Sequence, residues 1–248
     1  MQYDFDTELQ RRGTNSVKWD LAGPEELPMW VADMDFPAAP EIAEAIRRRA
    51  EHPVWGYTTL PDAWYEAVLG WWKTRHGFEM EREWLLFANG AVPAISSVVR
   101  RLTQPGEGVL IQSPVYNHFF ISIEDNGRRA VESLLQYENG TYRVDFADLE
   151  AKLADPQTTL MILCNPHNPT GMIWDRETLA RVGALCEKHR VLVLSDEIHC
   201  DLTVPGRSYV PFASVSEACA RNSITCVAPS QAFNLAGLQT SAVVIPGP

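Results

Sequence analysis

The chain lacks blocks of positive charge. Its 21 lysines and arginines are outnumbered by 32 aspartates and glutamates, which gives the 248 residues a net charge of −11. Without a basic cluster to contact phosphate backbones, nucleic acid is not an expected partner. The chain also lacks an apolar run long enough to span a membrane, and its acidic start is unlike a secretory signal. We therefore expect no membrane partner.

Cysteines are few, and they show no pairing pattern. The five are Cys164, Cys186, Cys200, Cys219 and Cys226. Their odd number and the lack of C-x-x-C spacing argue against a disulfide framework and a zinc site. Signatures of zinc proteases, α/β-hydrolases and P-loop nucleotidases are missing as well. We expect no bound metal, and reduced thiols inside a cytoplasmic protein.

What the chain does have is an alternation of apolar runs and amphipathic stretches. The pattern predicts helices over 41–51, 62–76, 91–102, 146–153 and 176–189, and strands over 85–88, 109–111, 160–164, 191–194, 224–227 and 242–245. Buried strands separated by helices predict an α/β domain with a mostly parallel sheet. The first forty or so residues are rich in Trp, Pro and Asp and have little periodicity, which indicates an irregular arm.

Polar residues follow directly after several predicted strands, at the edge of the sheet where ligands bind. Asp196 ends an apolar strand, where a carboxylate is costly unless a cation such as a protonated pyridine nitrogen faces it. A helix cap or loop aspartate is the alternative. Asn168 lies in the turn Asn165-Pro166-His167-Asn168-Pro169-Thr170-Gly171, where it could donate to a ring oxygen or only shape the turn. His199 could contact the same ligand as Asp196.

Two other motifs are open to a functional or a structural interpretation. Ala91 and Val92 begin a helix after Asn89-Gly90, so their backbone N–H groups could bind phosphate, although an ordinary turn would have the same sequence. Tyr116 could stack on a flat ligand or belong to the core. Tyr57 is similarly ambiguous.

Together these segments resemble the pyridoxal-phosphate (PLP) enzymes of fold type I, in the class I/II aminotransferase superfamily. Within it they are most similar to the cystathionine β-lyase (C–S lyase) branch typified by MalY and PatB. Seven motifs carry the resemblance in order: Arg12-Gly13-Thr14, Lys18-Trp19-Asp20, the stretch 29–37, Val92-Pro93-Ala94-Ile95, Ser113-Pro114-Val115-Tyr116, Ser195-Asp196-Glu197-Ile198-His199 and Phe233-Asn234-Leu235-Ala236-Gly237-Leu238.

The resemblance implies a three-layer αβα fold, the large domain of a PLP transferase. Residues 1–45 would form an N-terminal arm and part of a small domain, and residues 46–248 an incomplete PLP-binding large domain. The family continues beyond Pro248 with most of the small domain and the arginine that binds the substrate carboxylate. We therefore expect the C-terminal small domain to be absent from this chain.

The resemblance also implies a role for each site residue. Asp196 would pair with the pyridinium nitrogen, Asn168 and His199 would lie at the ring's 3′ oxygen, and Tyr116 would stack on the ring. The phosphate would be bound by the backbone of Ala91 and Val92 and by Ser230. A homodimer is implied, because Tyr57 would reach the cofactor of the neighbouring subunit.

At position 231 the sequence departs from the family. Gln231 stands where the family has the lysine that forms the Schiff base with PLP and removes the substrate's α-proton. The family reaction is β-elimination from an amino-acid thioether, which yields a thiol, pyruvate and ammonia. A neutral amide can serve neither lysine role. We expect little turnover from this chain, and PLP held without a covalent bond.

Two alternatives remain open. One is an aminotransferase of the same fold, which would need a keto-acid acceptor. The other is a PLP-binding protein without catalysis, which Gln231 favours.

Overall fold

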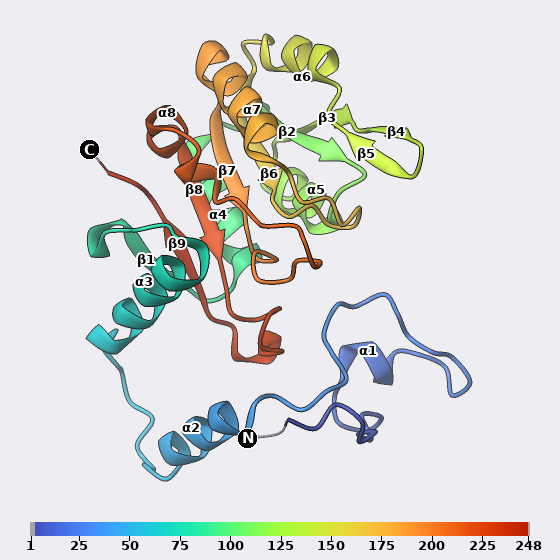
Figure 1. Cartoon of the computed structure of the whole chain (residues 1–248), viewed down its shortest axis with the longest axis vertical. Coiled ribbons are helices and arrows are strands. Elements are labelled where there is room, and N and C mark those ends of the chain that lie inside the picture. The colour runs from blue at the N-terminus through green and yellow to red at the C-terminus, as the bar shows by residue number, and fades with distance from the viewer. Residues whose placement is uncertain (1–2, 248) are drawn as a thin grey trace. The chain divides into compact units, whose positions relative to one another are not determined.

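The computed structural model describes residues 3–247, which form two compact units (Figure 1). Among these residues, the first unit combines 3–60 with the segment Pro229–Gln239. The second contains Pro61–Ala228 and residues 240–247. The domain boundary that we expect near residue 45 stays a prediction.

A seven-stranded sheet forms the centre of the second unit. Its order is β1 (Leu85–Ala88), β9 (Ser241–Val244), β8 (Ser223–Val227), β7 (Leu192–Asp196), β6 (Thr158–Cys164), β2 (Gly108–Ser113) and β3 (Arg129–Leu134). The five strands from β8 to β3 are parallel, and β9 runs antiparallel to both of its neighbours. The short strands β4 (Gln136–Glu138) and β5 (Thr141–Arg143) form a separate hairpin. The mostly parallel sheet is as the sequence predicts.

Helices cover both faces of this sheet (Figure 1). One face packs on α4 (Ala91–Leu102) and α5 (Asn117–Glu124). The other packs on α6 (Phe146–Leu153), α7 (Arg176–His189) and α8 (Glu217–Arg221), and α3 (Asp62–His76) lies against β1 and β9. Strand residues alternate between the faces, since Ile162 joins the first core cluster and Leu163 the second. The expected three-layer α/β class is confirmed.

The first unit has little regular structure. It contains the single-turn helix α1 (Val17–Asp20), the helix α2 (Pro40–Ala50) and the 3₁₀ turn Ala236–Leu238. Arg12 organises the loop after α1, because its guanidinium donates to four carbonyl oxygens, those of Trp19, Ala22, Gly23 and Glu26. Two other 3₁₀ turns, Arg82–Trp84 and Phe212–Ser214, belong to the second unit. Within residues 3–247 no helix is long and apolar enough to cross a bilayer.

Candidate active site

The candidate site lies at the edge of the sheet where β1, β2, β6, β7 and β8 end. These strands run in one direction, so the segments that follow them meet at that edge. The second unit places Ala91, Val92, Tyr116, Asn168, Asp196 and His199 there. Ser230 and Gln231 follow β8 along the chain but belong to the first unit, as does Tyr57.

Asp196 is the buried carboxyl of this edge. It is the last residue of β7, is 4% exposed, and pairs in register with Cys164 on β6 and Cys226 on β8. Burial raises the pKa of Asp196 to about 7; the Ile198 N–H, 3.3 Å from Oδ1, opposes the shift, and the nearby Glu197 charge adds to it. No basic side chain among residues 3–247 forms an ion pair with it. A buried carboxyl group that has a raised pKa and no basic partner is suited to binding a cationic ligand.

Tyr116 lies beside this carboxyl, just before α5. Burial raises the pKa of its phenol, and the charge of Asp196 raises it further, so the two groups interact. Its ring stacks on His118, with centroids 4.9 Å apart, and meets Phe119 edge to face at 5.8 Å. The ring is only partly buried, so an aromatic face remains at the sheet edge.

The turn after β6 is fixed from several sides. Asn165 is fully buried, and its Nδ2 donates to the Val210 carbonyl at 2.9 Å. The Nε2 of His167 lies 2.9 Å from the Pro114 carbonyl, which joins this turn to the end of β2. The Asn168 backbone N–H points to the Cys164 sulfur at 3.3 Å, and its side chain is partly buried. Asn165 and His167 therefore hold the turn, while Asn168 is the amide that remains nearer solvent.

The start of α4 presents free backbone donors. Gly90 precedes it with φ 115° and ψ 154°, a conformation that side chains disfavour. Its own N–H is bonded to the Ser241 hydroxyl at 3.2 Å, and its carbonyl accepts from Ala94. Ala91 and Val92 precede Ala94, the first residue whose N–H has an acceptor within the helix, so their N–H groups and the positive helix end face the sheet edge. This geometry suits a phosphate.

Glu197 is a buried carboxyl to which the sequence assigns no role. It is 1% exposed, and it accepts from the Ser195 hydroxyl at 2.7 Å, the Phe212 N–H at 2.9 Å, the Asn165 amide at 3.4 Å and the Tyr209 hydroxyl. Burial raises the pKa of Glu197, and these donors oppose the shift. Glu197 thus fastens the segment 209–212 to the end of β7, next to Asp196. Glu197 and Asp196 are adjacent carboxyls after the same strand, so the sequence alone does not indicate which of them holds the structure and which faces a ligand.

The remaining predicted residues are less constrained. His199 is partly buried, and burial lowers the pKa of its imidazole, which favours the neutral ring. Ser230 and Gln231 are partly buried in the first unit, where Leu235 donates its N–H to the Ser230 carbonyl at 2.9 Å. Tyr57 is fully exposed on the coil between α2 and α3.

One group in the described residues has the chemistry of metal ligands. His76, Cys200 and Asp201 offer ligand atoms within 4.8 Å of one another. The Asp201 carboxylate already accepts from the Trp71 indole at 3.1 Å and lies 3.0 Å from His76 Nε2. These contacts tie α3 to the segment after β7. The absence of a metal stays a prediction.

Comparison with known proteins places the chain in a family. The profile described as aminotransferase class I and II matches residues 27–246. The chain is 49% identical over 248 residues to cystathionine β-lyase PatB of Bacillus subtilis, covering 98% of this chain and 64% of PatB. It is 34% identical to protein MalY of Escherichia coli, covering 86% of this chain and 56% of MalY.

A solved structure agrees with these relatives. Cystalysin from Treponema denticola, whose crystal contains a pyridoxal 5′-phosphate cofactor, matches with a TM-score of 0.96 and 37% identity, over 100% of this chain and 65% of cystalysin. The chain thus spans less than two thirds of the length of these proteins. The resemblance drawn from the motifs is confirmed, and the chain belongs to the aminotransferase class I and II family.

Proposed function

We propose that this chain forms the cofactor-binding part of a PLP-dependent C–S β-lyase of the cystathionine β-lyase type. Asp196 is the observation that carries the proposal, because it is a buried carboxyl without a cationic partner among residues 3–247. A pyridinium N–H facing it would supply the missing charge. The likeness to PatB, a cystathionine β-lyase, supports the reaction class, and an amino-acid thioether is the substrate that it implies.

The residues at the sheet edge fit PLP group by group. Asp196 would accept a hydrogen bond from the protonated ring nitrogen, whose positive charge would keep the carboxylate ionised near neutral pH. Ala91 and Val92 would donate their N–H groups to the phosphate, and the resemblance adds Ser230, in the first unit, as a further donor. Tyr116 would cover one face of the ring, and Asn168 and His199 would hydrogen-bond its 3′ oxygen. When bound, PLP supplies the electron sink that allows the C–S bond to break.

Gln231 determines how far this chemistry can proceed. Its amide is neutral and nearly non-basic, so it can neither take a proton from the substrate's α-carbon nor bind the cofactor covalently. We infer that this chain holds PLP through noncovalent contacts alone. Release of pyruvate from cystathionine should be nearly absent, and Gln231→Lys should give PLP that borohydride fixes to the protein at that position.

A PLP titration tests the site directly. Asp196→Asn keeps the side chain's shape but removes its charge. It should weaken PLP binding about 10- to 100-fold, since a buried hydrogen bond to a charged group contributes roughly 1.5–3 kcal/mol. Asp125→Asn is the matched control, because Asp125 is exposed at the end of α5. Equal affinities for the two variants would overturn the assignment of Asp196, and rapid pyruvate release by the unchanged chain would overturn the role given to Gln231.

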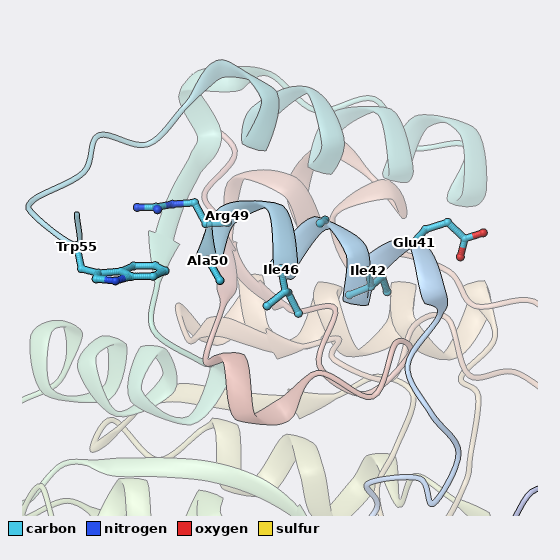
Figure 2. A pocket seen from close by; sticks show the side chains of 7 residues that line it. Glu41, Ile42, Ile46, Arg49, Ala50 and Trp55 are labelled. Atoms are coloured by element: carbon cyan, nitrogen blue, oxygen red, sulfur yellow. The ribbon is translucent and has the colours of Figure 1, made fainter. Parts of the chain in front are cut away.

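We further propose that the protein works as a homodimer in the cytoplasm. One side of α2 carries Ile42 and Ile46 in a pocket of about 550 Å³ that Arg49 and Trp55 also line (Figure 2). The coil that follows exposes Val54, Trp55 and Tyr57. Apolar surface of this kind supports a partner, and a second copy would take up Tyr57 as the resemblance implies. The five free, buried cysteines support a reducing compartment.

A further inference from the structure

Asn234 lies three residues after Gln231 and bonds to a distant part of the chain. Its Nδ2 donates to the carbonyls of Met34 and Phe36 at 2.9 and 3.0 Å, and its Oδ1 accepts from the Met34 N–H at 3.0 Å. The side-chain amide thus pairs with both polar groups of Met34, much as one strand pairs with another. Asn234 itself is left-handed, with φ 57°.

The segment that Asn234 contacts is held firmly from within the arm. The Asp35 carboxylate accepts from Arg11 at 2.6 Å, Lys18 at 2.7 Å and the Trp19 indole at 2.7 Å. Arg11 also donates to Asp33 at 2.6 Å and to the Met34 carbonyl at 3.1 Å. Burial would raise the pKa of Asp35, but the three donors outweigh it and lower the pKa to about 2. Residues 33–36 are therefore a fixed support for Asn234.

The turn that carries position 231 is closed on itself. The Phe233 N–H donates to the Pro229 carbonyl at 3.0 Å, and the Leu235 N–H donates to the Ser230 carbonyl at 2.9 Å. These bonds leave little freedom between positions 229 and 235. Fixing Asn234 therefore also fixes the backbone of Gln231.

We propose that Asn234 is a positioning residue, which holds position 231 in place by fastening its turn to the arm. This inference rests on the proposed function, because position 231 matters only if PLP binds beside it. The ion cluster of the arm would then set the position of a side chain some two hundred residues away in sequence.

The test uses the full chain with Gln231→Lys, alone and combined with Asn234→Gly. Glycine keeps the left-handed backbone without strain, so the variant removes only the side-chain bonds. Asn139→Gly is the matched control, because Asn139 is also left-handed, with φ 51°, and is exposed in the β4–β5 turn. A further variant, Asn234→Asp, keeps the acceptor for Met34 but loses both donors.

Two readouts separate the contact from its consequence. Hydrogen exchange at the Met34 amide should become faster in Asn234→Gly and stay unchanged in Asn139→Gly. The rate at which borohydride traps PLP at position 231 should fall about 10- to 100-fold in both Asn234 variants, as expected for a reacting group displaced by about an ångström.

The outcomes distinguish this inference from the proposed function. If Gln231→Lys traps no PLP while Asn234 is intact, the proposed function fails, and this inference fails with it. If trapping is equally fast with and without the Asn234 amide, although the Met34 amide exchanges faster, only the positioning role is overturned. Unchanged Met34 exchange in Asn234→Gly would overturn the contact itself.

Discussion

At the residue scale, Asp196 makes the stability of the ligand-free protein depend on pH. Its pKa is about 7 in the folded chain and close to 4 in an unfolded one, so folding favours the protonated acid. The stabilising contribution is fully present below about pH 4 and is lost as pH rises through 7. We expect ligand-free Asp196→Asn to be more stable than the parent at pH 8 by about 4 kcal/mol, at 1.36 kcal/mol per pKa unit, and to gain little at pH 4.

Urea unfolding at the two pH values measures this difference. Saturating PLP should shrink it, because a pyridinium facing Asp196 favours the ionised form. A stability gap that stays the same at pH 4 and pH 8 would mean that Asp196 does not titrate as its burial implies.

Glu197 gives the second prediction at this scale. Glu197→Ala leaves the donors of Ser195, Tyr209 and Phe212 without an acceptor in a buried place. We expect it to destabilise the protein by about 3 kcal/mol or more in urea unfolding. Glu124→Ala, at an exposed position of α5, should change the stability by less than about 0.5 kcal/mol. Similar small losses for both would show that the Glu197 network contributes little.

At the element scale, replacing each of two helical glycines with alanine should change the protein's stability in opposite directions. In α3, a methyl group on Gly70 would meet nothing within 4 Å, so Gly70→Ala should stabilise the helix by about 0.5–1 kcal/mol. In α7, a methyl group on Gly183 would overlap the Cys219 sulfur of α8. Gly183→Ala should therefore destabilise the protein by roughly 1–3 kcal/mol, since overpacking costs that much. Thermal unfolding of the two variants in parallel decides whether α7 and α8 pack this closely.

The helices and strands show which parts of the fold can be predicted from the sequence alone. Strong periodicity and clear end signals predict α3, α4, α6 and α7 with the bounds that the structure has. The sequence misses α5 and β3. The α5 segment, Asn117–Glu124, is half polar and has no side-chain cap at its start, unlike α6, where Asp145 caps the first turn. The β3 segment shows neither an apolar run nor a clear alternation. Such elements are stabilised by packing against the sheet more than by local preference.

The site is predictable to a similar degree. Asp196 and Tyr116 stand out because each follows an apolar strand, and the structure brings both to one sheet edge. Glu197 and Asn234 do not stand out, since their roles depend on partners such as Tyr209 and Met34 that are distant in sequence. A motif can indicate which side chains face a ligand, whereas the residues that hold them are found only when the fold is known.

At the scale of the whole molecule, the coil between α2 and α3 should be the first place that a protease cuts. Trp55 and Tyr57 are exposed there, on a stretch without regular structure. Brief chymotrypsin treatment should yield a large fragment that begins after one of these residues, identified by mass spectrometry. If a second copy takes up Tyr57 as we propose, cleavage should slow in the assembled, PLP-loaded protein. Equal cleavage rates in monomeric and assembled fractions would contradict that interface.

The bonds of Asn234 also bear on synthesis in the cell. Met34 is synthesised two hundred residues before Asn234, so its amide has to wait about 10 to 40 s for its partner at ordinary translation rates. During that interval the arm can form its ion cluster but not its hydrogen bonds to Asn234. The exposed Trp30 and Met29 next to it are then open to chaperones, and the arm is completed only once Asn234 has left the ribosome.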